Sequence, residues 1–250
     1  MKFNFIKTNA LILILFFTFT SCVKEIYYQN GGKTIKGNKE STIENREIDK
    51  NFQEIKKSGF TDLIITDKIQ AGNISLEGES NLLEYVETEV KNSTLYIGFK
   101  KNTSIRAHQD IVLKVNPKNL TALNSAGSGD ISTERKIKAK DFKINQTGSS
   151  DLNLNLETEN LHIKMAGSGD VKLAGKSTTM EVNKTGSGDI YAYDFSVKQA
   201  KINSTGSGDA EINVAEDLQI SNTGSGDIYY KGNPDKIKVS STGSGDIVEK

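Results

Sequence analysis

Apolar and polar residues alternate along most of the chain from residue 43 onward, with the two-residue period of β-strands. In the second half, apolar residues stand six and four positions before a recurring glycine, as Phe142 and Ile144 do. Others stand one and three positions after a recurring aspartate, as Val171 and Leu173 do. The pattern predicts an all-β fold in which two strands flank each glycine-aspartate segment.

The segment between these strands is a repeated motif. Gly-Ser-Gly-Asp occurs six times, and a near-copy, Gly-Ser-Ser-Asp, departs from it at Ser150. Successive copies are 21, 19, 19, 20, 18 and 19 residues apart. A fixed period of this length is typical of a solenoid, in which one supersecondary unit stacks on copies of itself. The copies begin at Gly127, Gly148, Gly167, Gly186, Gly206, Gly224 and Gly243.

The period predicts the kind of solenoid. About 19 to 20 residues closing three short sides make one coil of a parallel β-helix, and equivalent strands of neighbouring coils then pair at about 4.8 Å. Polar segments such as 157–160 and 175–178 would hold the third side. A single coil buries too few apolar side chains to offset its ordering, so the coils must stack. The alternative is an antiparallel β-sandwich made of hairpins, but the regular motif favours the helix.

The first half lacks the motif but is still strand-like. We expect residues 43–250 to form one β-helix domain, in which 120–250 are the regular repeats. Residues 43–119 would be irregular N-terminal coils that cap one end of the stack, as atypical terminal repeats commonly do.

The N-terminus predicts export. A basic start, the apolar run 10–19 and small residues before Cys22 are typical of a signal peptide over residues 1–21. Cys22 is the only cysteine, which excludes a disulfide within the chain, and its position resembles the lipid-modified first residue of a bacterial lipoprotein. The polar stretch 22–42 would then be a flexible tether to the membrane. The alternative is a signal peptide cut elsewhere, with Cys22 a free thiol.

Charge argues against nucleic acid as a partner. The chain has 32 basic and 32 acidic residues and a formal net charge of zero, without the basic cluster that such a partner needs. Catalysis is also disfavoured. The two histidines, His108 and His162, are interpreted as surface residues, and the three arginines offer little to neutralise an acidic substrate (Arg46, Arg106 and Arg135).

The aspartates of the motif are the sharpest chemical feature. On stacked coils they form a row about 4.8 Å apart, where neighbouring carboxylates repel by about 0.9 kcal/mol in a water-like dielectric. The structural interpretation is that each carboxylate accepts hydrogen bonds from backbone N–H groups at its corner. The functional alternative is Ca²⁺ bound between successive carboxylates, and no other cofactor is expected. The row comprises Asp130, Asp151, Asp170, Asp189, Asp209, Asp227 and Asp246.

Three features together carry a family resemblance: the recurring Gly-Ser-Gly-Asp followed by Ile or Val, the stretch 226–234, and Phe60-Thr61-Asp62-Leu63 upstream. They resemble the bacterial auto-transporter adhesin head GIN domain family, over about residues 47–248. The resemblance implies a right-handed β-helix in an exported or lipid-anchored protein, with adhesion in the family name. It implies no catalytic residues.

The expected function is therefore an exported, lipid-anchored binding or structural module, adhesin-like and attached to the outer membrane. Tyr191, Tyr193, Tyr229 and Phe195 are candidates for exposed rings that stack on sugars, so a glycan or a surface protein is the expected ligand. The alternatives are a scaffold or sensor component facing the periplasm and, less favoured, a polysaccharide-active enzyme. Lys24-Glu25 after the cysteine weakly indicates surface export.

Overall fold

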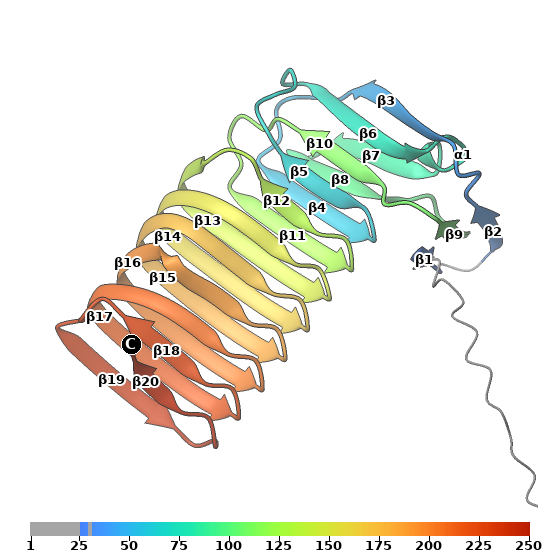
Figure 1. Ribbon diagram of the computed structural model, residues 1–250. Helices are drawn as coiled ribbons and strands as arrows, with labels where there is room; N and C mark the ends of the chain where they lie inside the picture. The colour runs from blue at the N-terminus through green and yellow to red at the C-terminus, as the bar shows by residue number, and fades with distance from the viewer. Residues whose placement is uncertain (1–25, 30–31) are drawn as a thin grey trace, which may run out of the picture.

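The chain folds as an elongated stack of β-coils with antiparallel strands at one end (Figure 1). The computed structural model describes residues 26–29 and 32–250, so the expected signal peptide, Cys22 and Lys24-Glu25 lie outside the described residues. Equivalent strands of successive coils pair in parallel along their length. The predicted parallel β-helix is confirmed, and the repeats do not form the hairpins of a sandwich.

In each coil one strand ends at the first glycine of the motif and the next begins after its aspartate. The pairing of two neighbouring long strands runs from Leu152 opposite Val171 to Gly167 opposite Gly186 and skips only position 159. The third side expected at 157–160 is therefore part of one long strand. The coil strands are β4 (Glu54–Gly59), β5 (Asp62–Ile65), β11 (Ala122–Gly127), β12 (Ile131–Thr133), β13 (Ile137–Gly148), β14 (Leu152–Gly167), β15 (Val171–Gly186), β16 (Ile190–Gly206), β17 (Ala210–Gly224), β18 (Ile228–Lys231), β19 (Lys236–Ser241) and β20 (Ile247–Glu249).

The alternating apolar residues fill the inside of the stack. Phe142, Leu161, Met180, Ala200 and Leu218 occupy one register position in five successive coils, and each is at most 5% exposed. Each of these side chains therefore packs against the coil before it and the coil after it. This is why the repeats fold as a stack.

The two glycines of the motif are required for different reasons. The first adopts a left-handed conformation in most coils, with φ of +114° at Gly186, and a Cβ there would lie 2.3 Å from the carbonyl oxygen of Gly167. The second has no left-handed φ, but a Cβ at Gly188 would lie 2.2 Å from the oxygen of Gly169. Glycine is needed there because neighbouring coils approach so closely.

Ser150 replaces the second glycine in one coil without left-handed strain, because its φ is not positive. Its side chain is fully buried, and its hydroxyl donates to the carbonyl oxygen of Gly129. The hydroxyl of Ser125 donates to Ser150 Oγ over 2.8 Å. The altered motif is therefore an ordinary corner with an internal hydroxyl pair.

The stack contains one corner in addition to the seven copies of the motif. β4 and β5 pair in parallel with β11 and β12, and Gly59 lies opposite Gly127. The segment Gly59-Phe60-Thr61-Asp62 thus forms the first corner, although it shares only its outer residues with the motif. Residues 66–121 lie between β5, which leaves this corner, and β11, which leads into the second corner.

The N-terminal end of the stack is covered by most of residues 66–121 and by β3, the strand that precedes β4. β8 continues the coil side beside β4, and β10 continues the side beside β5, both in parallel. Antiparallel strands are then added at each side, so the irregular coils expected over 43–119 are only partly coils. The elements are β3 (Ser41–Glu47), β6 (Asn73–Glu79), α1 (Ser80–Leu83), β7 (Val86–Lys91), β8 (Thr94–Phe99) and β10 (Val112–Val115).

A separate three-stranded sheet lies beside this end. Strand β9 (Thr103–Ala107) pairs with β1 (Ile26–Tyr28) on one side and β2 (Lys33–Lys36) on the other. The flexible tether expected over 22–42 is thus wrong for the paired parts of that stretch. In the described part of the chain, no helix is long and apolar enough to cross a membrane.

We predict that Gly186→Ala destabilises the protein by about 2–5 kcal/mol, because the new Cβ both strains the left-handed backbone and pushes against the preceding coil. Urea unfolding followed by circular dichroism measures the change. Ser187→Ala at the neighbouring exposed position is the control, and we expect it to change stability by less than about 0.5 kcal/mol. Equal effects of the two substitutions would contradict this account of the corner.

Candidate functional site

The aspartates of the corners form one continuous hydrogen-bonded row, here called the aspartate edge. In each corner the backbone N–H of the aspartate donates to Oδ1 of the aspartate one coil earlier, over 2.7–3.0 Å in all seven pairs. The first acceptor is Asp62, which extends the row predicted from the motif by one. The edge comprises Asp62, Asp130, Asp151, Asp170, Asp189, Asp209, Asp227 and Asp246.

The carboxylates accept a hydrogen bond that no backbone carbonyl accepts. The carbonyl before the aspartate points into the coil, where buried side chains bond it: Gln146 Nε2 donates to Ser150 O, and Asn222 Nδ2 donates to Gly226 O, each over 2.9 Å. The aspartate N–H therefore lacks a partner in the strand ladder. The carboxylate of the preceding coil supplies one, which satisfies a group that would be costly to leave unpaired.

Two buried lysines lie beneath the edge. Lys57 Nζ donates to the carbonyl oxygens of Thr61 and Gly129, and Lys184 Nζ donates to those of Gly188 and Gly208. Each lysine is only 2% exposed. Burial lowers the pKa of Lys57 to about 8, although Asp62 and Asp130 act in the opposite direction.

The carboxylates differ in their surroundings. Burial raises the pKa of Asp170, and repulsion from Asp189 and Asp151 adds to this, while the N–H of Asp189 opposes it. The pKa of Asp227 is lowered instead, by the N–H of Asp246 and the hydroxyl of Tyr229. Burial likewise raises the pKa of Asp62, at the other end of the edge. Asp62 and Asp170 are therefore more readily protonated than Asp227.

Tyrosines lie on the coil face that follows the aspartate edge, here called the tyrosine face. Tyr191 is 39% exposed, and its hydroxyl donates to Asp189 Oδ2 over 3.0 Å, which raises the pKa of Tyr191 to about 12. Tyr229 donates to Asp227 in the same way over 2.9 Å. Tyr193 and Tyr229 are half-buried, while Phe195 is fully buried, so the expectation of an exposed ring at Phe195 is wrong.

The spacing of the tyrosines follows from the register. Tyr191 lies opposite Glu211, and Glu211 lies opposite Tyr229, so the two rings share one column two coils apart, roughly 10 Å. Lysine ammonium groups lie over two of the three tyrosine rings. Lys231 Nζ is 4.9 Å from the Tyr193 centroid, and Lys250 Nζ is 4.5 Å from that of Tyr229. The face alternates aromatic and charged side chains along the stack.

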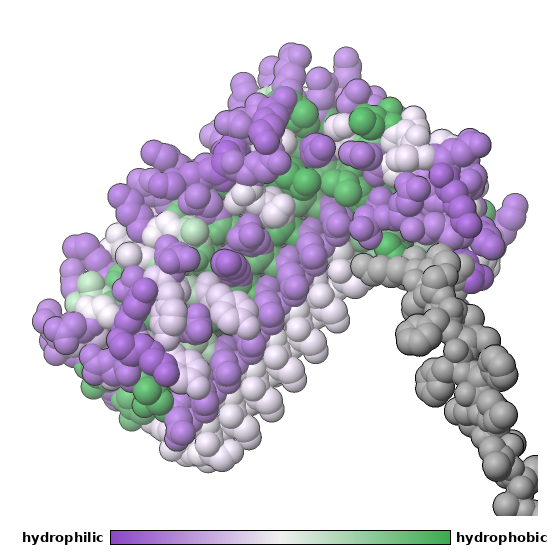
Figure 2. Space-filling model, viewed as in Figure 1, coloured by the Kyte–Doolittle hydropathy of each residue, from purple (hydrophilic) through white to green (hydrophobic). Residues whose placement is uncertain are grey.

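A shallow groove of about 470 Å³ connects the edge and this face. Carboxylates line one side of it, and Tyr191 and Lys172 lie at its end. Along the stack, hydrophilic side chains form a row beside a paler ridge, and apolar surface shows on the other side of the row (Figure 2). The groove runs across several coils and has no enclosed end, so it suits an extended ligand better than a small one.

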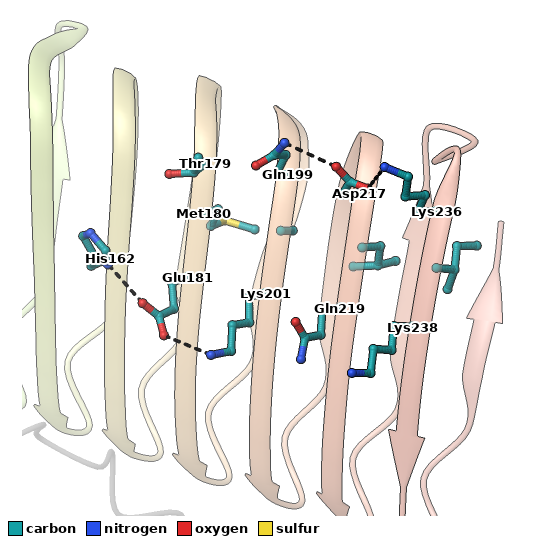
Figure 3. A pocket seen from close by; sticks show the side chains of 13 residues that line it. His162, Thr179, Met180, Glu181, Gln199, Lys201, Asp217, Gln219, Lys236 and Lys238 are labelled. Atoms are coloured by element: carbon teal, nitrogen blue, oxygen red, sulfur yellow. Dashed lines mark hydrogen bonds and ion pairs between the residues drawn. The ribbon is translucent and has the colours of Figure 1, made fainter.

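A second hollow of about 530 Å³ lies on the coil face that precedes the corners (Figure 3). Its charged groups bond one another: Glu181 lies 3.3 Å from His162 Nδ1 and 3.8 Å from Lys201 Nζ. Asp217 likewise lies 3.6 Å from Lys236 Nζ. These groups satisfy one another along the strands, and they do not converge on one point as catalytic groups do.

The histidines differ from each other. The side chain of His162 is 46% exposed, but that of His108 is only 7% exposed, and its Nδ1 lies 3.0 Å from Oε1 of the buried Glu79. The expectation of a surface position for His108 is thus wrong. Over residues 26–29 and 32–250, no group of three or more Asp, Glu, His or Cys side chains is arranged to hold a metal ion.

Sequence reasoning missed Lys57, Lys184 and Asp62. Both lysines stand two residues before the first glycine of a corner, a position that the strand alternation directs inward. That signal could have identified them. Asp62 could have been found from the spacing of Gly59 and Asp62, which matches the motif without its serine and second glycine.

A family model matches residues 51–234, which is most of the chain, and its description is "Putative auto-transporter adhesin, head GIN domain". This agrees with the resemblance that the motif carries. The family is described by adhesion and is not a family of enzymes. A comparison with curated proteins gives no match.

Solved structures share the fold over nearly their whole length. A "putative adhesin" from Bacteroides fragilis is 23% identical with a TM-score of 0.77, and the match covers 86% of this chain and 100% of that one. A "putative lipid binding protein" from Parabacteroides distasonis is 27% identical, with a TM-score of 0.69 and coverage of 87% and 100%. A "putative adhesin" from Parabacteroides merdae is 25% identical, with a TM-score of 0.66 and coverage of 87% and 99%.

We predict that Asp170→Ala destabilises the protein by about 1–3 kcal/mol, because the partly buried N–H of Asp189 loses its acceptor. Asp170→Asn keeps an acceptor oxygen, so we expect it to cost less than about 1 kcal/mol. Asp246→Ala is the matched control, because that carboxylate accepts no hydrogen bond from any described residue. Urea unfolding measures all three. If Asp246→Ala were as costly as Asp170→Ala, the ladder would not explain the row.

Proposed function

The chain belongs to the family described as "Putative auto-transporter adhesin, head GIN domain", and on this premise we propose that it is an exported, lipid-anchored binding module of the cell envelope. Its role is to present a binding surface at the cell exterior rather than to catalyse a reaction. The family membership and the shape of the stack support this proposal.

The observation that carries the proposal is the tyrosine face beside the aspartate edge. Tyr191 offers an exposed ring, and the carboxylates of Asp151 and Asp170 lie along the same groove. Aromatic rings stack on the apolar faces of sugars, while carboxylates accept hydrogen bonds from hydroxyl groups. The pair of ring and carboxylate recurs once in the same column, at Tyr229 and Asp227 two coils further along the axis.

A linear glycan is therefore the ligand class that the surface fits best. A chain of sugars has a repeating shape and many hydroxyl donors, and the open groove crosses several coils. Neutral or amine-bearing sugars match the row of carboxylates, whereas acidic sugars are repelled by it. Weak contacts at successive coils then add to a useful affinity.

We predict that the double substitution Tyr191→Ala and Tyr229→Ala abolishes or weakens glycan binding at least tenfold, because both rings of the column are lost. Binding of the purified protein to an array of neutral, amine-bearing and acidic glycans measures this. Tyr96→Ala is the matched control, because Tyr96 is also 39% exposed but lies on β8 at the capped end. Binding that survives the double substitution, or a preference for acidic glycans, would refute the assignment of this face.

We predict that Cys22→Ser moves the protein from the membrane fraction to the soluble fraction of the producing cells, because the anchor needs the thiol. Incorporation of a radiolabelled fatty acid into the wild-type chain, and its absence from the variant, checks the chemistry directly. Protease treatment of intact cells then distinguishes the exterior from the periplasm. A domain that is digested only after lysis would exclude a surface adhesin.

A further inference from the structure

Two parts of the segment 22–42, for which a flexible tether is expected, pair with the domain. β1 and β2 pair with β9 on either side, and Gly37 N donates to Arg106 O over 2.9 Å. Further bonds hold the residues after β2: Asn38 N donates to Asn81 Oδ1 over 3.0 Å, and Lys39 N donates to Glu79 Oε1 over 2.6 Å. The stretch from β2 to β3 is therefore part of the folded domain.

The carboxylate of Glu79 is the centre of this attachment. It is fully buried, and it accepts bonds from the backbone N–H groups of Lys39 and His108 and from the ring of His108. Although burial opposes this, those hydrogen bonds hold the pKa of Glu79 below its usual value. The carboxylate of Glu79 thus stays ionised at neutral pH and continues to accept these hydrogen bonds.

Docking shortens the connection to the proposed anchor. Only three residues separate Cys22 from Ile26, the first residue of β1. Four Cα–Cα steps span at most about 14 Å, so a lipid on Cys22 would keep β1 within that distance of the membrane surface. In this respect the inference rests on the proposed lipid anchor.

The surface that would then meet the membrane is basic. Lys33, Lys36 and Lys39 are all exposed, and Glu40 is the only acidic residue in the segment 32–40. Lys101, in the turn between β8 and β9, is exposed as well. Hydrophilic side chains cover this end of the molecule in Figure 2. Lys33 and Lys36 point to opposite faces of the edge strand β2, so these lysines surround the end of the domain at β2 rather than one side of the sheet. We call Lys33, Lys36, Lys39 and Lys101 together the basic face.

We propose that the basic face docks on phosphate-bearing anionic lipid headgroups, so that the capped end of the stack rests on the membrane and the last coils point away from it. Lysines near an anionic bilayer are attracted to it and add to a lipid anchor that holds them there. The aspartate edge runs along the stack, away from the surface that would repel it. The outer coils are then the part offered to a ligand.

The test separates the basic face from the lipid. The full chain carrying Cys22→Ser is added to vesicles of phosphatidylglycerol with phosphatidylethanolamine, and to vesicles of phosphatidylcholine alone. We expect binding to the anionic vesicles only, with binding falling as salt rises. Each basic residue near an anionic surface contributes about 1 kcal/mol, which is about fivefold in binding. We therefore expect vesicle binding to weaken about a hundredfold in the triple variant Lys33→Gln, Lys36→Gln and Lys101→Gln.

The matched control replaces three exposed lysines of the repeats, Lys198→Gln, Lys201→Gln and Lys238→Gln. We expect this variant to bind as the parent does. Equal losses in both variants, or no binding to anionic vesicles, would overturn the docking face. Neither outcome bears on the lipid itself, which the fatty-acid labelling of Cys22 decides. If labelling fails while the vesicle result holds, the anchor is wrong and the basic face stands.

Discussion

One hydrogen bond, repeated between neighbouring coils, determines the corner on which the stack depends. The N–H of each corner aspartate cannot reach a backbone carbonyl, because the carbonyl beside it points inward, and the carboxylate of the preceding coil takes its place. The aspartate thus acts as a substitute for a missing strand carbonyl. Every coil needs one for the next coil to bond, which explains why the residue recurs without change.

The same hydrogen bond determines which side chains fit next to the corner. Coils close enough for N–H to meet carboxylate bring a Cβ at either glycine against the preceding coil, as the 2.2 Å approach at Gly188 shows, and among the copies of the motif only the corner of Ser150 accommodates one at the second position. They also bring carboxylates together, and Lys57 and Lys184 lie beneath the edge with their ammonium groups bonded to corner carbonyls. On the outside, tyrosine hydroxyls bond the second oxygen of two of these carboxylates, Asp189 and Asp227. The Oδ1 atoms of the edge are therefore largely used within the protein, which leaves the Oδ2 atoms of Asp151 and Asp170 and the exposed ring of Tyr191 for a ligand.

Much of this could be predicted from the sequence. Two-residue alternation and a fixed period led to stacked parallel coils, and they located seven of the eight aspartates, because local pattern and global fold agree in the repeats. The capped end could not be predicted in the same way. Its strands pair antiparallel across long separations, and the polar stretch 22–42 contains strands that are stabilised by pairing with β9 rather than by their own pattern. Phe195 was misjudged because an irregularity in β16 breaks the two-residue alternation and turns this side chain inward. His108 was misjudged because its partner Glu79 lies far away in the sequence.

The most direct test of the central claim is amide hydrogen exchange at the corner aspartates, followed residue by residue with NMR. The account predicts that the N–H groups of Asp170, Asp189 and Asp209 exchange as slowly as those of the adjoining strands, although they lie in surface turns, because each is bonded to a carboxylate. Exchange at the rate of an open loop would contradict it. The carboxylates would then not stabilise the corners, and the recurrence of aspartate in every coil would need another explanation.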